Sequence, residues 1–131
     1  GLEKFDGTPL YERQNPAEAI HPFWGTLLYN YGSPMVKDFL ISNACFWAEV
    51  YHADGLRMDD VDAMLYLDYG RNPGEWTPNI YGTNENLDAL EFLKHLNSVI
   101  KERNPGLLLV AQENGLWPEL TDSVGNEQGS Y

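Results

Sequence analysis

Residues 54–61, Asp-Gly-Leu-Arg-Met-Asp-Asp-Val, alternate charged with apolar side chains over the length of a short strand. Successive side chains of a strand point to opposite faces. Leu56 and Met58 are therefore expected to face a covering layer of helices, while Arg57 and Asp59 share the other face. An arginine beside an aspartate favours the ionised carboxylate. The segment predicts either a nucleophilic carboxylate at a strand end or a purely structural ion pair.

The segments around this strand predict the order helix, strand, loop, helix, strand. Ser33 and Pro34 are expected to begin a helix that runs to about His52, and Asn84 to cap a second helix that ends near residue 103. Residues 107–111 form an apolar run that is too short for a helix and typical of a strand buried on both faces. This order favours a parallel α/β architecture. The first helix is expected to bury one apolar face, made of Val36, Phe39, Leu40, Trp47 and Val50.

Two long segments, residues 1–32 and 62–83, are rich in Gly, Pro, Asn and aromatic residues and are predicted to be structured loops, with one helical turn near Ala63. In parallel α/β folds, such loops and the residues that end the strands lie at the active edge of the sheet. Any single aromatic side chain there is more often a packing residue. Together they favour a sugar site, because sugar faces stack on aromatic rings: Trp24, Tyr66, Tyr69, Trp76, Tyr81 and Trp117.

The composition excludes some partners. A net charge of -12 over 131 residues argues against nucleic acid and against an anionic membrane surface. No apolar run reaches the length of a membrane span. With Cys45 as the single cysteine, no intrachain disulfide is possible, which favours a reducing, cytoplasmic setting. A neutral polymer is the better expected partner.

Several motifs resemble the catalytic barrel of bacterial glycogen branching enzymes, members of the α-amylase superfamily (glycoside hydrolase family 13). The resemblance runs from Leu2 to about Thr121. It is carried by residues 54–59 and by Met-Leu-Tyr-Leu-Asp-Tyr at 64–69, Gly-Glu-Trp-Thr-Pro-Asn at 74–79, Glu-Asn-Leu at 85–87, Glu-Phe-Leu at 91–93, Phe-Asp-Gly-Thr-Pro-Leu-Tyr at 5–11 and His-Pro-Phe-Trp-Gly-Thr at 21–26.

The resemblance implies a partial (β/α)8 barrel with about two central strands, their helices and long active-site loops. The implied parts are a loop over 1–32, a helix and nucleophile strand over 33–61, an aromatic loop over 62–83, a helix and acid/base strand over 84–114, and a truncated loop over 115–131. Two of eight strands cannot close a barrel, so the chain alone is expected to be inactive.

The implied activity is that of a 1,4-alpha-glucan branching enzyme in glycogen biosynthesis, with no cofactor and no metal. A carboxylate attacks the anomeric carbon, and the enzyme-bound chain is transferred to a 6-hydroxyl of another glucan. By matching, Asp59 is the nucleophile and Arg57 the arginine that supports it. Trp24, Tyr66 and Trp76 are expected to bind the α-1,4-glucan.

The acid/base position departs from the family pattern Ala-Glu-Glu, because this chain reads Ala111-Gln112-Glu113. The straightforward match places Gln112 at the position of the catalytic acid, and an amide cannot donate a proton to the leaving oxygen. Either Gln112 makes the site inactive, or Glu113 supplies the acid through a bulge or an early end of the strand. Asp60 is a second departure, since its position is commonly a small residue; it could act on the nucleophile or point into solvent.

Two alternatives stay open. One is an inactive α-amylase-type domain that only binds glucan, which Gln112 would support. The other, much less favoured, is a cation site on Asp59, Asp60 and Asp62. The three histidines are scattered along the chain and are given no role; His52 and His95 are expected on helices, and Cys45 in the core.

Overall fold

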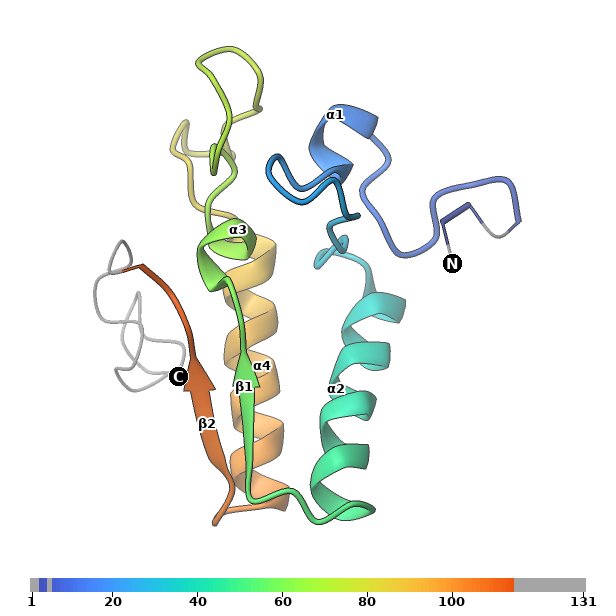
Figure 1. The fold of residues 1–131 in the computed structure, drawn as a ribbon, viewed down its shortest axis with the longest axis vertical. Coiled ribbons are helices and arrows are strands. Elements are labelled where there is room, and N and C mark those ends of the chain that lie inside the picture. Colours follow the sequence, from blue (N-terminus) through green and yellow to red (C-terminus); the bar gives the residue numbers. More distant parts are fainter. Residues whose placement is uncertain (1–2, 5, 115–131) are drawn as a thin grey trace.

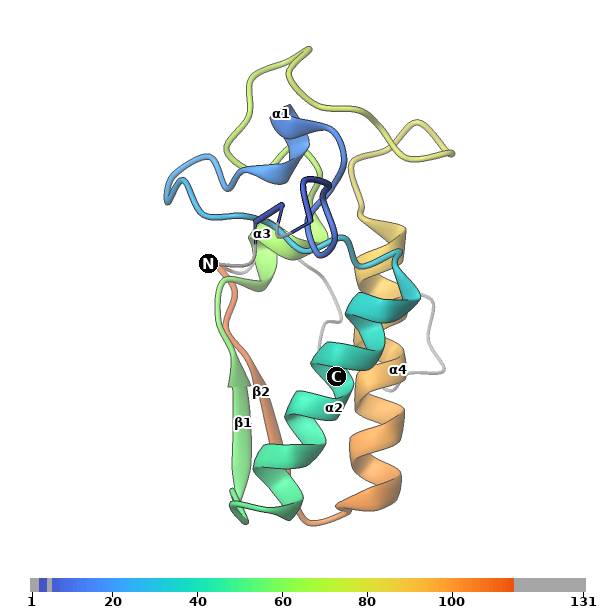
Figure 2. The same ribbon diagram turned by 90° about the vertical axis from the view of Figure 1, so that its right-hand side faces the viewer.

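The computed structural model describes residues 3–4 and 6–114. In chain order its elements are α1 (Pro16–Ala19), α2 (Pro34–Glu49), β1 (Gly55–Met58), α3 (Val61–Leu65), α4 (Leu87–Arg103) and β2 (Leu108–Ala111). Figure 1 shows β1 and β2 side by side, with the long loops gathered beyond their carboxyl ends. Figure 2 shows both long helices on the same side of the sheet. The chain is thus a small α/β layer, as predicted.

The two strands are parallel, with Gly55 opposite Leu108 and Met58 opposite Ala111. A parallel pair needs a long crossover, which α3, a loop and α4 provide. Met58 and Ala111 pack against the core, whereas Leu108 is 64% exposed and lies on the opposite face. The expected burial of the second strand on both faces is therefore wrong for the described residues, because the long helices cover only one face of the sheet.

The N-cap of helix α4 lies two residues later than predicted. Asn86, not Asn84, is the N-cap, and its side-chain oxygen accepts a hydrogen bond from the Ala89 amide at 3.2 Å. The other side-chain group of Asn86 donates to the Met64 carbonyl at 3.1 Å, while Asn84 donates to Asp68 instead. Asn86 is the cap because its side chain also forms a hydrogen bond to α3. The buried side of α4 consists of Ala89, Leu90, Phe92, Leu93, Leu96, Asn97 and Ile100.

Helix α2 begins at Pro34 as predicted, but its buried stripe is narrower than expected. Val36 is fully buried, and Cys45 joins the core as predicted. Phe39, Trp47 and Val50 are 42%, 45% and 59% exposed, so the predicted apolar face is wrong at these three positions. The helix also ends before His52, which lies in the left-handed region with φ 55°.

The first loop contains more structure than the sequence indicated. Asn15 caps the one-turn helix α1, and its side chain accepts a hydrogen bond from the Ala17 amide at 3.1 Å. Two isolated antiparallel bridges, Glu12 with Tyr29 and Ile20 with Leu27, fold the segment back on itself. The predicted helical turn near Ala63 is confirmed as α3.

Candidate active site

Arg57 and Asp59 form the ion pair that the alternation predicted. The Arg57 Nε atom lies 2.6 Å from Asp59 Oδ1, and Nη2 donates to Oδ2 at 3.3 Å. Two donors on two carboxylate oxygens fix the orientation of the group. Both side chains are more than half exposed, so the carboxylate is open to a ligand.

The ladder between the strands is interrupted just after Asp59. The Gln112 amide donates to the Met58 carbonyl at 2.9 Å, but the Gln112 carbonyl accepts from Val61, not from Asp60, at 3.1 Å. Asp60 is the extra residue, with φ 53° and ψ 47°, and its amide donates to the Gln112 side-chain oxygen at 3.3 Å. The bulge thus lies in the strand of Asp59, not at Gln112–Glu113.

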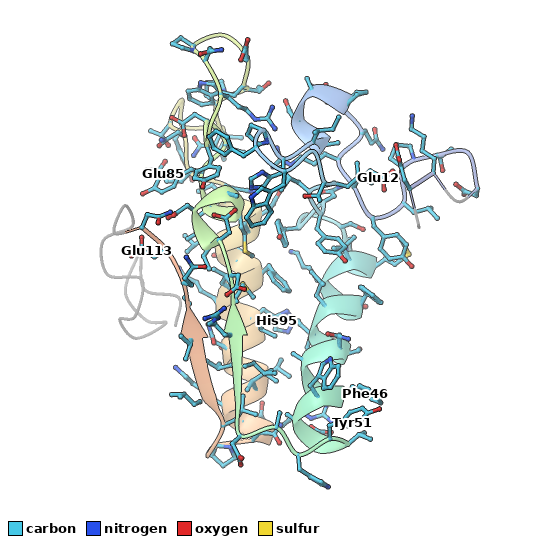
Figure 3. The ribbon with its side chains drawn as sticks, in the orientation of Figure 1. Glu12, Phe46, Tyr51, Glu85, His95 and Glu113 are labelled. Carbon is cyan, nitrogen blue, oxygen red and sulfur yellow. The ribbon has the colours of Figure 1, made fainter. Side chains whose placement is uncertain are left out.

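The register places Gln112 next to Asp59. One step beyond the Met58–Ala111 pair, these two residues are neighbours, and both are exposed. Glu113 is half-buried, and alternation directs it to the other face. Burial together with the charges of Asp62, Glu85, Glu113 and Asp68 raises the pKa of the Tyr66 phenol. Figure 3 shows Glu113 beyond the end of β2.

Asp60 accepts hydrogen bonds from two loops. His21 Nε2 lies 2.9 Å from Asp60 Oδ2, and the Tyr69 hydroxyl donates to Oδ1 at 3.2 Å. The side chain of His21 is only 3% exposed and that of Asp60 only 14%. Partial burial and the Asp60 carboxylate raise the pKa of the Tyr69 phenol, which keeps it a donor. The suggestion that Asp60 points into solvent is wrong.

Sequence reasoning missed the role of His21. His21 and Asp60 are 39 positions apart, a separation that no local pattern links. The available signals were the acidic residue in place of a small one at position 60 and the aromatic motif that starts at His21. Neither signal alone identifies His21 and Asp60 as partners of one hydrogen bond.

A cavity of about 390 Å³ opens beside the strand end. Its lining brings together Trp24, His21, Arg57, Asp59 and Asp60. The predicted residues Trp24, Arg57 and Asp59 are therefore adjacent to one space. Mostly apolar residues of the first loop, both strands and helices α2, α3 and α4 line the remainder of the cavity.

The other predicted aromatic residues lie elsewhere. Tyr66 lines a separate cavity of about 20 Å³ with Tyr69 and Arg71, and Trp76 lines neither of these two cavities. Tyr81 is 76% exposed on its loop. Trp117 lies outside the described residues. The structure thus joins Trp24, but not Tyr66 or Trp76, to the acidic strand end.

The two loops of the site are fastened to each other. Arg71 donates to the carbonyls of Ala17 and Ile20, the latter at 2.8 Å. Gly70 has φ 65°, and a Cβ atom added there would lie 2.7 Å from the Phe23 ring. Only glycine satisfies both the backbone conformation and the close contact. These contacts therefore hold the loop that carries His21 in a fixed position against the loop that carries Tyr69.

Asp62 does not join the nucleophile. Asp62 is 1% exposed, and its Oδ2 atom accepts two hydrogen bonds from Asn114, at 2.9 and 2.6 Å. Among residues 3–4 and 6–114, no group of three or more His, Cys, Asp or Glu side chains is arranged to hold a metal ion. Within the same residues, no helix combines the length and the apolar character that crossing a membrane requires.

No protein-family model matches the chain. Curated relatives match it closely: it is 54% identical over 121 residues to the 1,4-alpha-glucan branching enzyme of Methylococcus capsulatus, 53% over 123 residues to that of Thermobifida fusca, and 56% over 118 residues to that of Rubrobacter xylanophilus. These matches cover 92%, 94% and 90% of the chain, but only 16% of each relative. By sequence, the chain corresponds to one segment of the 1,4-alpha-glucan branching enzymes.

Proposed function

We propose that this chain forms part of the catalytic centre of an enzyme that cleaves an α-1,4-glucan and transfers the released chain to a 6-hydroxyl. The Arg57–Asp59 pair carries the proposal, because it lies at a strand end, beside an aromatic-lined cavity, in a chain about half identical to branching enzymes. In the complete protein, further strands are proposed to extend the sheet through the exposed edge into a (β/α)8 barrel. Glycogen synthesis suggests a cytoplasmic setting, in keeping with a buried free thiol at Cys45.

In the proposed reaction, Asp59 attacks the anomeric carbon and forms a glycosyl ester while the bond to the leaving oxygen breaks. An acid gives that oxygen a proton. The acceptor 6-hydroxyl then loses its proton to the same group and displaces Asp59 with a second inversion. Arg57 orients the attacking oxygen, and Trp24 offers a ring for stacking. Tyr66 and Trp76 are proposed to contact more distant glucose units.

The proton donor has two candidates. Gln112 lies next to Asp59 but has no acidic proton to give. Glu113 is a carboxylic acid but lies on the other side of the sheet, so it serves only if the strand end turns. We propose Glu113 as the acid of the complete enzyme. The position of Gln112 is the observation behind the alternative, a domain that binds glucan without branching it, which the branching-enzyme relatives do not favour.

The test is a chimera in which this chain replaces the matching segment of the Thermobifida fusca branching enzyme. The chimera is expected to form new α-1,6 linkages in amylose, and Asp59→Asn to lower the rate by about a thousandfold or more. Asp54→Asn is the matched control, because Asp54 is exposed at the start of the same strand. Equal activity of the Asp59 and Asp54 variants would refute the proposed nucleophile.

A further inference from the structure

We propose that Asp60 is a positioning residue which, through His21, holds Trp24 as a platform for one glucose ring of a linear α-1,4-glucan beside Asp59. This inference rests on the proposed function, since it assumes that a glucan enters the cavity. It assigns a purpose to Asp60, the acidic residue directly after the nucleophile, which the reaction itself does not use.

The first step is the backbone of Asp60. Its left-handed conformation makes the bulge, and aspartate is among the few non-glycine residues that adopt this conformation readily. Because the bulge inserts one residue, the Asp60 carboxylate turns away from the Arg57–Asp59 pair and toward the loops, where its two oxygens meet different donors. The nucleophile and the positioning carboxylate are therefore adjacent in sequence but separate in their contacts.

The second step is the orientation of the imidazole. The backbone amides of Phe23 and Trp24 donate to His21 Nδ1 at 3.3 and 3.2 Å. An atom that accepts two hydrogen bonds carries no proton, so Nε2 holds the proton and donates it to Asp60. The ring is fixed from both edges. Its burial removes water as a competing partner.

The third step is Trp24. Its ring stacks on the imidazole at a centroid distance of 4.4 Å and an interplanar angle of 8°. The residue nevertheless remains 62% exposed and lines the same cavity as Asp59. One face of the indole is thus supported by His21, while much of the residue stays open. A supported, open ring in a cavity with the nucleophile suits stacking against a sugar.

The fourth step concerns the contacts that hold His21 and the two loops in place. Tyr69 holds the second oxygen of Asp60, and its ring packs edge-on against His21 at a centroid distance of 5.8 Å. Gly70 and Arg71 fasten the same loop to residues 17–23. Asp60 consequently connects both loops to the strand of the nucleophile.

The experiment measures the affinity of the chimera for maltoheptaose by calorimetry, and turnover of α-glucosyl fluoride, which reports whether Asp59 still attacks. Asp60→Gly keeps the left-handed backbone but deletes the carboxylate. It is expected to weaken maltoheptaose binding about tenfold, because Trp24 loses its support, while the fluoride is still turned over. Asp60→Asn should restore binding, because its oxygen can accept from His21 while its amide donates to Tyr69.

A double-mutant cycle tests whether the effect passes through Trp24. Trp24→Ala should weaken binding about as much as Asp60→Gly, and the double variant should lose little more, because both changes remove the same platform. Tyr51→Ala is the matched control, since Tyr51 is also 62% exposed but lies at the far end of α2 (Figure 3). It should bind maltoheptaose as the unmodified chimera does.

Different outcomes separate the two proposals. An unmodified chimera that neither binds maltoheptaose nor turns over the fluoride overturns the proposed function, and the inference with it. An active chimera in which Asp60→Gly leaves affinity unchanged, or in which the losses from Asp60→Gly and Trp24→Ala simply add, overturns the inference alone. If Asp60→Gly misfolds by circular dichroism, the comparison of Asp60→Asn with His21→Phe decides: equal affinities contradict the proposal.

Discussion

The side-chain oxygen of Gln112 accepts a hydrogen bond from the backbone amide of Asp60 at 3.3 Å. The residue at the expected acid position thus stabilises the bulge that follows the nucleophile. Its amide group suits this task, because an amide accepts a hydrogen bond without placing a second negative charge beside Asp59. The same bond holds the Gln112 side chain at the strand end that carries Asp59.

The acid role can be assigned by comparing two leaving groups in the chimera. If Glu113 is the proton donor, Glu113→Gln should slow glucan transfer by about a hundredfold or more, yet leave formation of the glycosyl ester from α-glucosyl fluoride nearly unchanged. Gln112→Ala should have a milder effect. The opposite result, no loss with Glu113→Gln and a gain with Gln112→Glu, would show that Gln112 occupies the acid position of an inactive site.

The close contact between Gly70 and Phe23 gives a second prediction. Gly70→Ala adds a backbone penalty at φ 65° and a clash with Phe23, so it should destabilise the site by about 1–3 kcal/mol. Gly74→Ala is the control, because Gly74 has φ 88° but no atom within 4 Å of an added Cβ. Thermal unfolding of the chimera should show the larger loss for Gly70→Ala. Equal losses would mean that the clash with Phe23 is relieved without cost.

The cap of α4 gives a third prediction. Asn86→Ala removes the cap and leaves the Met64 carbonyl without its partner, at a cost of about 1–2 kcal/mol. Asn84→Ala removes a less buried bond to Asp68 and should cost less. Denaturant unfolding of the two variants ranks them. A larger loss of unfolding free energy for Asn84→Ala than for Asn86→Ala would indicate that Asn84 caps the helix, as the sequence pattern predicted.

The sequence was informative where the relevant contacts are local. Alternation placed Arg57 and Asp59 on one face, helix periodicity found α4, and Ser33 with Pro34 marked the start of α2, because each pattern depends on neighbours only a few positions away. The identity of the cap was harder to predict, since Asn84 and Asn86 differ only in the contact that Asn86 makes with α3.

The network of His21 could not be predicted, for a physical reason. Its bond to Asp60 depends on a left-handed residue that shifts the ladder by one position, and on two long loops that return to the strand end. Bulges and loop returns leave weak periodic signals. The same bulge explains why Asp60, expected in solvent or on the nucleophile, instead contacts the loops.

The last prediction concerns alkaline pH. Burial and the Asp60 carboxylate raise the pKa of Tyr69 in the folded state above the value of about 10 that an unfolded tyrosine has. Tyr69 therefore contributes stability that is complete below about pH 10 and is lost as the pH rises through the raised pKa. Asp60→Asn removes the negative charge and should lower that pKa.

The measurement is the phenolate absorbance of the chimera as a function of pH, taken as the difference from a Tyr69→Phe variant so that one phenol is followed. The transition should occur at lower pH in Asp60→Asn than in the parent, because the phenolate no longer faces a carboxylate. Asp54→Asn serves as the control, since it removes one equal charge at the other end of β1. An identical shift in both variants would trace the raised pKa to overall charge and not to Asp60.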